Sequence, residues 1–145
     1  MKDIEIISGV YTSELPLKYA DAGIFAGFPS PAQDYMDKSL DFNREIIRHP
    51  AATFYAKVLG QSMEGAGIDT GDIVVVDRAL DPRDGDIVVA CINGEFTLKY
   101  IDLSKRDQGI ICLRPDNNKY DPIFLQEGDQ LVVWGVVSSV IKRFR

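Results

Sequence analysis

One serine in this chain lies in a setting that suits a nucleophile. Ser62 occurs in GQSMEGAGI, residues 60–68, among small and flexible residues directly after an apolar run. A serine hydroxyl attacks poorly until a base removes its proton. The single histidine, His49, precedes Pro50 in an expected loop, where a histidine is more often solvated or packed than catalytic. Lysine is the other candidate base.

Lys99 is the lysine that we consider for this role. An ordinary lysine has a pKa near 10.4, so only about one in two thousand is neutral at pH 7. Lowering that pKa to about 7–8 takes about 4 kcal/mol, from desolvation or a nearby positive charge. Alternation along EFTLKYI places Thr97 and Lys99 on one face of a strand and Leu98 on the other. That pattern alone favours a solvated lysine, and periodicity does not decide whether this face lines a cleft.

The composition disfavours several classes of protein. Acidic residues outnumber basic ones by 22 to 16, which gives a net charge of −6 and disfavours direct sequence-specific DNA binding. The N-terminus has acidic residues where a signal peptide needs positive charge, and no segment approaches a transmembrane span. Cys91 and Cys112 lack metal-ligand and redox spacing and are expected to be buried. We therefore expect a cytoplasmic protein with no cofactor, no metal and no membrane contact.

Turn and strand signals divide the chain into two unequal parts. Up to about residue 50 the pattern is weak, although a capping box that begins at Ser30 predicts a short helix over Pro31 to Ser39. From Thr53 onward, short β-type runs alternate with turns, and Asn93-Gly94 is the strongest hairpin signal. Continuous Val and Ile runs indicate strands buried on both faces. The expected fold is mainly β, with an extended N-terminal arm and a short helix.

Two stretches resemble a known peptidase domain. GQSMEGAGIDTGDIVVVD, followed by GDIVVACINGEFTLKYI, is similar to the Ser-Lys domain shared by LexA-type repressors and UmuD-type mutagenesis proteins. The resemblance implies a compact β domain in which Ser62 is the nucleophile and Lys99 the general base of an autocatalytic serine peptidase. We expect Thr97 to hydrogen-bond the lysine head group. Backbone N–H groups of Ser62 and Met63 would stabilise the oxyanion.

Residues beside the nucleophile are expected to serve the turn and the core. Gln61 stands where the family usually has Asp or a small polar residue, and we expect no loss of chemistry, because this side chain need not contact the substrate. Gly65 and Gly67 are either hinge residues or a tight turn into the next loop. Met63 is expected to pack in the core.

The resemblance extends upstream and implies a cleavage point. AGFPSPAQDYMDKSLDFNREIIRHPAATFYAKVLGQSM is similar to UmuD-type proteins nearly without gaps, which implies self-cleavage between Ala26 and Gly27. Small residues on both sides let the main chain approach a nucleophile closely, and an extended arm can lie along a strand edge. The predicted parts are an arm removed by cleavage (1–26), a linker with a short helix (27–52) and a Ser-Lys peptidase β domain (53–145). Residues 1 to about 20 match weakly, so the contacts of the arm stay open.

The resemblance also implies partners. Only 26 residues precede Gly27, without a helix-turn-helix pattern, so a LexA-type repressor is not expected. A UmuD-like member would be a homodimer of the SOS response, with self-cleavage stimulated by a RecA filament on single-stranded DNA. The processed form would be an accessory subunit of a UmuC-like Y-family translesion polymerase. Whether an arm reaches its own Ser62 or its partner's stays open. The alternative is a non-catalytic β adaptor that binds a polymerase, and a general peptidase acting on other chains is weaker.

Overall fold

The structure is a computed structural model, and it describes residues 3–7, 16–19 and 38–145. Contacts divide the chain into two compact units, residues 1–9 with 51–145 and residues 10–50. Each unit has a sheet of its own. The N-terminal residues therefore share a unit with the expected β domain, whereas the division into cleavage products after residue 26 stays a prediction.

The smaller unit holds a two-stranded sheet and a short helix. Strands β2 (Pro16–Tyr19) and β3 (Lys38–Asp41) pair antiparallel. Helix α1 (Phe42–Ile46) follows β3 directly. Asp41 is its N-cap, and the Asp41 side chain accepts a hydrogen bond from the Arg44 amide at 3.3 Å. An aspartate at this position satisfies an amide that the first helical turn leaves unpaired.

The predicted helix over Pro31 to Ser39 lies mostly outside the described residues, as does its capping box from Ser30. At its last two positions the prediction is wrong, because Lys38 and Ser39 belong to β3. Their backbone pairs with β2, which lies about twenty residues earlier in the chain. Pairing with a distant segment overrides a local helix preference at these two residues.

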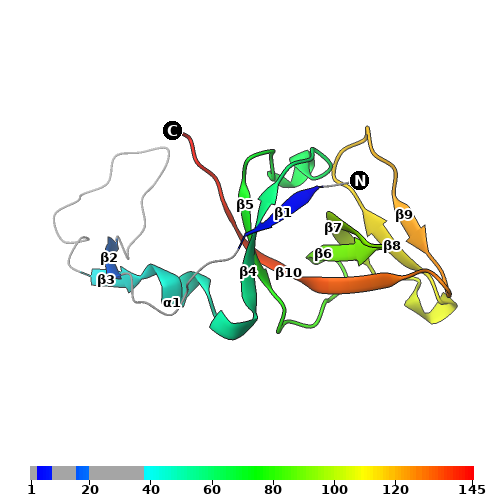
Figure 1. The fold of residues 1–145 in the computed structure, drawn as a ribbon, viewed down its shortest axis with the longest axis horizontal. Coiled ribbons are helices and arrows are strands. Elements are labelled where there is room, and N and C mark those ends of the chain that lie inside the picture. The colour runs from blue at the N-terminus through cyan, green and yellow to red at the C-terminus, as the bar shows by residue number, and fades with distance from the viewer. Residues whose placement is uncertain (1–2, 8–15, 20–37) are drawn as a thin grey trace. The chain divides into compact units, whose positions relative to one another are not determined.

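The larger unit is one antiparallel sheet of eight strands in the order β1-β4-β5-β10-β6-β7-β8-β9 (Figure 1). This arrangement confirms the predicted mainly β fold. Three short 3-10 helices, η1 to η3, lie in its connections. The bounds of its elements are β1 (Ile4–Ile7), η1 (Pro50–Ala52), β4 (Thr53–Val58), η2 (Glu64–Ala66), β5 (Ile73–Asp77), β6 (Ile87–Ile92), β7 (Glu95–Asp102), η3 (Arg106–Gln108), β8 (Ile111–Arg114), β9 (Ile123–Leu125) and β10 (Leu131–Ile141).

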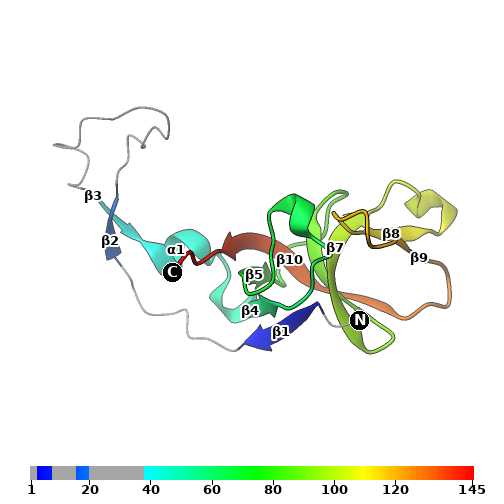
Figure 2. The same ribbon diagram turned by 90° about the horizontal axis from the view of Figure 1, so that it is seen from above.

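The long strand β10 connects the two halves of this sheet and bends it. Its first half pairs with β6 and its second half with β5, and the register shifts at Val133/Gly135 and at Val137/Ser139. Bulges of this kind bend a strand and increase its twist. A side chain at Gly135 would meet Val76 Cγ1 at 2.7 Å, so glycine permits the close approach. The sheet curls, so that β1, which lies beside β4 in both views, also approaches β7 (Figures 1 and 2).

The hairpin between β6 and β7 fixes the position of Lys99. Asn93 and Gly94 have φ values of 50° and 86°, the left-handed conformations that a tight two-residue hairpin turn requires. The predicted Asn-Gly hairpin is confirmed. Its register places Lys99 opposite Val88 in the buried strand β6.

The core lies on both faces of the central strands. Val88, Val89 and Ala90 are each fully buried, and Val88 and Val89 belong to two different core clusters. The predicted burial of these strands on both faces is confirmed. Cys112 is buried, Cys91 is half-buried, and both are free thiols. No helix among the described residues is long and apolar enough to cross a membrane.

Candidate active site

Ser62 lies in a turn that the end of β4 and the start of β5 hold in place. Val58 donates to the Asp72 carbonyl and accepts from the Gly71 amide, both at 2.8 Å, which closes the loop between these strands. Ser62 is 2% exposed. Met63 packs in the core as predicted, and it anchors the turn beside the serine. Gly67 has φ +80°, which confirms its interpretation as a turn residue.

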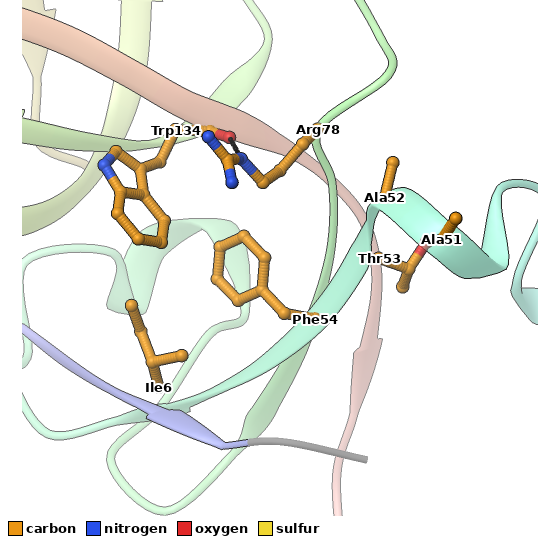
Figure 3. A pocket seen from close by; sticks show the side chains of 7 residues that line it. All are labelled: Ile6, Ala51, Ala52, Thr53, Phe54, Arg78 and Trp134. Carbon is orange, nitrogen blue, oxygen red and sulfur yellow. Dashed lines mark hydrogen bonds between the residues drawn. The ribbon is translucent and has the colours of Figure 1, made fainter. Parts of the chain in front are cut away.

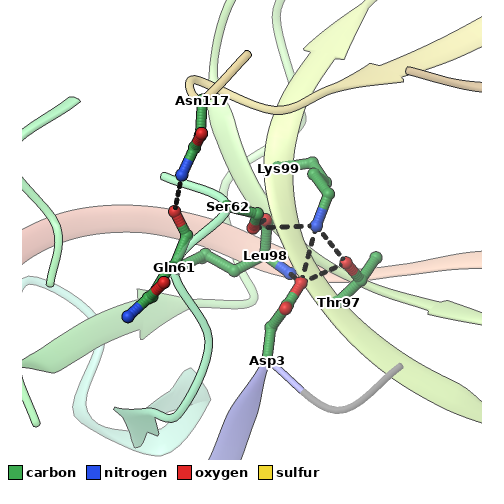
Figure 4. Close-up of polar contacts among 7 residues, drawn as sticks. All are labelled: Asp3, Gln61, Ser62, Thr97, Leu98, Lys99 and Asn117. Atoms are coloured by element: carbon green, nitrogen blue, oxygen red, sulfur yellow. Dashed lines mark hydrogen bonds and ion pairs between the residues drawn. The ribbon is translucent and has the colours of Figure 1, made fainter. Parts of the chain in front are cut away.

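A second loop braces this turn. The Asp116 amide donates to the Ser62 carbonyl at 2.7 Å, and the Gly65 amide donates to the Asp116 carbonyl at 2.7 Å. Asn117 Nδ2 donates to the Gln61 carbonyl at 2.9 Å (Figure 4). A side chain at Gly65 would meet the Asp116 carbonyl oxygen at 2.7 Å, so this glycine serves a close backbone approach. No sequence pattern indicates this brace, because the loop around Asp116 carries only ordinary turn residues.

Lys99 is buried, contrary to what strand alternation alone favours. The residue is 2% exposed, and its Nζ lies 3.0 Å from Ser62 Oγ (Figure 4). Lys99 Nζ also donates to Thr97 Oγ1 at 2.8 Å, the contact expected for Thr97. Ser62 Oγ in turn donates to the Leu98 carbonyl at 3.4 Å. An amine at 3.0 Å from a hydroxyl is within reach of its proton, and the catalytic roles of Ser62, Lys99 and Thr97 stay predictions.

Asp3 is the site residue that the sequence did not reveal. Its Oδ2 accepts from Lys99 Nζ at 2.6 Å, from Thr97 Oγ1 at 2.5 Å and from the Leu98 amide at 3.1 Å. Burial acts to raise the pKa of the Asp3 carboxyl, but the hydrogen bonds from Lys99, Thr97 and Leu98 and the charge of Lys99 outweigh it, so this pKa lies below its usual value. No spacing links residue 3 to β7, and only the curl of the sheet brings them together.

The other predicted residues have different outcomes. Ala26 and Gly27 lie outside the described residues, so their approach to Ser62 stays a prediction. His49 is exposed and belongs to the smaller unit. The role of the Met63 amide in an oxyanion hole also stays a prediction.

A separate pocket of about 460 Å³ opens beside Trp134 (Figure 3). The Trp134 ring packs edge-on against Phe54 and Phe96, with centroids 5.7 and 4.8 Å apart. The Arg78 guanidinium lies 4.7 Å from the centre of the same ring. The described residues that line it include no carboxylate, cysteine, histidine or lysine. Its lining residues are Ile6, Ala51, Ala52, Thr53, Phe54, Arg78 and Trp134.

Comparison with known proteins agrees with this fold. Residues 20–138 match the family described as peptidase S24-like. Protein SamA of Salmonella typhimurium is 45% identical over 120 residues, which cover 83% of this chain and 81% of SamA. Protein MucA of Escherichia coli is 44% identical over 116 residues, which cover 79% of this chain and 77% of MucA. The LexA repressor of Thermobifida fusca is 36% identical over 120 residues, which cover 83% of this chain and 45% of the repressor.

The chain therefore belongs to the peptidase S24-like family, among its UmuD-like members. Membership of this family supports a serine-peptidase fold and a role in SOS mutagenesis.

Proposed function

We propose that this protein cleaves its own chain between Ala26 and Gly27, with Ser62 as nucleophile and Lys99 as general base. The observation that carries the proposal is the 3.0 Å contact between Lys99 Nζ and Ser62 Oγ, with both residues 2% exposed. A buried site favours the neutral amine that a lysine base requires, provided that no negative charge stays beside it. The family match supports the same chemistry.

The reaction follows from these groups. The neutral amine of Lys99 takes the Ser62 proton as Oγ attacks the Ala26 carbonyl carbon, and the negative charge moves to the carbonyl oxygen. The amides of Ser62 and Met63 stabilise that oxyanion. When the carbon–nitrogen bond breaks, the Lys99 ammonium gives its proton to the departing Gly27 amine. A water molecule, deprotonated by Lys99, then hydrolyses the Ala26 ester and restores Ser62.

The cleavage switches the protein once from one functional form to another, and it is not a metabolic reaction. A RecA filament on single-stranded DNA stimulates it, and the product, residues 27–145, serves a UmuC-like Y-family translesion polymerase as a homodimeric accessory subunit. The similarity to SamA and MucA over about four fifths of the chain supports this role.

Incubation of the purified full chain from neutral to alkaline pH tests the proposal, with products weighed by mass spectrometry. A fragment that begins at Gly27 is expected, and it forms faster as pH rises because more of the lysine is neutral. Ser62→Ala and Lys99→Ala abolish it, whereas Lys57→Ala, which removes an exposed lysine of β4, leaves the rate unchanged. An intact chain at every pH, even with an activated RecA filament, would leave the non-catalytic adaptor as the function.

A further inference from the structure

The hydrogen bonds of Lys99 correspond to its charged form. A lysine ammonium has three N–H donors and no acceptor. Lys99 Nζ has three acceptors within 3.0 Å, which are Asp3 Oδ2, Thr97 Oγ1 and Ser62 Oγ. A general base needs the reverse arrangement toward the serine, with a nitrogen lone pair directed at the hydroxyl proton. The geometry is therefore that of a resting site rather than of a site ready to react.

Asp3 is held in this position from two sides. Its carboxylate accepts from β7, through the Thr97 hydroxyl, the Leu98 amide and Lys99. Its backbone carbonyl accepts from the Leu59 amide at 2.6 Å and the Gly60 amide at 3.3 Å, in the turn that leads to Ser62. A side chain at Gly60 would lie 2.6 Å from Asp3 Oδ1, so the turn encloses this carboxylate closely.

Asp3 directly precedes an edge strand, β1. β1 pairs with β4, from Ile4 opposite Val58 to Ile7 opposite Tyr55, and it ends the strand order on that side. An edge strand can leave without breaking any other pair of the sheet. Asp3 also lies on the N-terminal side of the proposed cleavage point, so it belongs to the arm that cleavage would separate from the β domain.

We propose that Lys99 Nζ, Thr97 Oγ1 and the Leu98 amide form a carboxylate-binding site, and that Asp3 occupies it as an inhibitory plug carried by β1. While the plug is in place, the carboxylate keeps Lys99 charged and Ser62 keeps its proton. Release of β1 removes the negative charge and frees the base. The inhibitory part rests on the proposed self-cleavage, whereas the carboxylate site itself does not.

Among the described residues, the charged and polar groups that contact Lys99 Nζ come from three segments. Asp3 directly precedes β1, Ser62 lies in the turn after β4, and Thr97 belongs to β7 itself. Asp116, whose backbone braces Ser62, directs its carboxylate to the Tyr100 hydroxyl at 3.0 Å. Asp3 is therefore the carboxylate whose removal should act on Lys99.

Asp3→Asn tests the plug because it keeps the shape and removes the charge. Removing the negative charge beside an amine favours the neutral form of that amine. The self-cleavage rate of Asp3→Asn should therefore rise at lower pH than that of the natural sequence, and at neutral pH cleavage should be about tenfold faster or more. Glu5→Gln, which removes an exposed carboxylate from the adjoining strand β1, is the matched control and should change neither the pH dependence nor the rate of cleavage.

A second readout does not depend on cleavage. In a Ser62→Ala background, trace acetylation with acetic anhydride modifies neutral amines, and peptide mapping reports each lysine. We expect Lys99 acetylation to rise about tenfold or more in Asp3→Asn and Asp3→Ala, relative to exposed Lys57 in the same molecule. Added sodium acetate should slow Lys99 acetylation again in Asp3→Ala, compared with sodium chloride at equal ionic strength, because acetate refills the site.

The outcomes separate the two proposals. An unchanged pH profile in Asp3→Asn together with unchanged Lys99 acetylation overturns the plug, and so does slower cleavage in Asp3→Asn. Equal effects of acetate and chloride in Asp3→Ala overturn the carboxylate site. If no variant with Ser62 intact cleaves at any pH but Lys99 acetylation rises as expected, self-cleavage fails while the carboxylate site stands. Far-UV circular dichroism of each variant confirms that the β domain is folded.

Discussion

Two lysine–aspartate contacts of this molecule are almost equally short but lie in opposite settings. Lys99 Nζ is 2.6 Å from Asp3 Oδ2, and the two side chains are 3% and 9% exposed. Lys142 Nζ is 2.7 Å from Asp69 Oδ2, where the side chains are 32% and 54% exposed. Lys142 also contacts Asp72 Oδ2 at 2.5 Å. Distance alone does not distinguish these contacts.

Access to water does distinguish them. An exposed lysine or carboxylate that loses its partner is solvated at once, so most exposed pairs contribute little to stability. A buried group that loses its partner must stay unpaired, change its protonation or open the structure. The Lys99–Asp3 contact can therefore control the protonation of a proposed catalytic base, whereas the Lys142 contacts involve no proposed catalytic group.

The largest expected effect comes from breaking the buried contact on the lysine side. Lys99→Met, in a Ser62→Ala background, keeps a long side chain but removes the charge that neutralises Asp3. The free energy of unfolding should fall by about 3 kcal/mol. This value is at the low end of the range for a broken buried ion pair, because β1 can leave the sheet and expose the Asp3 carboxylate to water. Urea denaturation followed by circular dichroism measures this change.

A double-mutant cycle isolates the contact itself. When Asp3→Asn is already present, Lys99→Met no longer leaves an unpaired carboxylate, so its effect should be clearly smaller. If Lys99→Met lowered the free energy of unfolding equally with and without the Asp3 carboxylate, the two residues would not act as a pair.

Much of the fold and part of the candidate site could be predicted from the sequence. Val and Ile runs predicted the buried strands, and Asn93-Gly94 predicted the hairpin that sets the position of Lys99. Local patterns of this kind need no knowledge of distant contacts. The motif around Ser62 and the strand around Lys99 pointed to a pair, and the structure brings their side chains to 3.0 Å.

The rest depended on how distant segments meet. Alternation alone placed Lys99 on a solvated face, and it is buried because the Ser62 turn and β1 cover that face. Asp3 is 96 residues away from Lys99 in the chain, and Asp116 is 54 away from Ser62, by their numbers. Neither belongs to a recognisable pattern with its partner. Only the bends of β10 and the resulting curl of the sheet explain these contacts.

Lowering the pH should remove the stabilising contribution of the Lys99–Asp3 contact over a defined pH range. The pKa of Asp3 lies below its ordinary value of 3.8, so its stabilising contribution is complete above about pH 4 and is lost as pH falls through the lower, folded-state value. The difference in unfolding free energy between Asp3→Asn and its parent, both with Ser62→Ala, should be constant from neutral pH to that point and then shrink.

Urea denaturation at a series of pH values measures this difference. The other acidic groups are common to both proteins, so their contributions cancel in the difference. One of them is Asp102, whose pKa is lowered to about 2 by hydrogen bonds from Ser104 and Arg114. A difference that begins to shrink well above pH 4 would show that the Asp3 carboxylate is not held as an anion in the folded protein.

The smallest effect is expected at the contacts of Lys142, whose ammonium is open to water although one of its two partners, Asp72, is buried. The Asp69 and Asp72 carboxylates raise the pKa of Lys142 above its usual value, yet water can replace the ammonium when Lys142→Ala removes it. Buried Asp72 keeps a hydrogen bond from the Asp69 amide at 2.8 Å, so it is not left unpaired. The urea midpoint should therefore change little at low salt and not at all at high salt, where exposed charges are screened. If Lys142→Ala destabilised the protein as much as Lys99→Met does, contact geometry rather than burial would decide how much a lysine–aspartate pair contributes to stability in this fold.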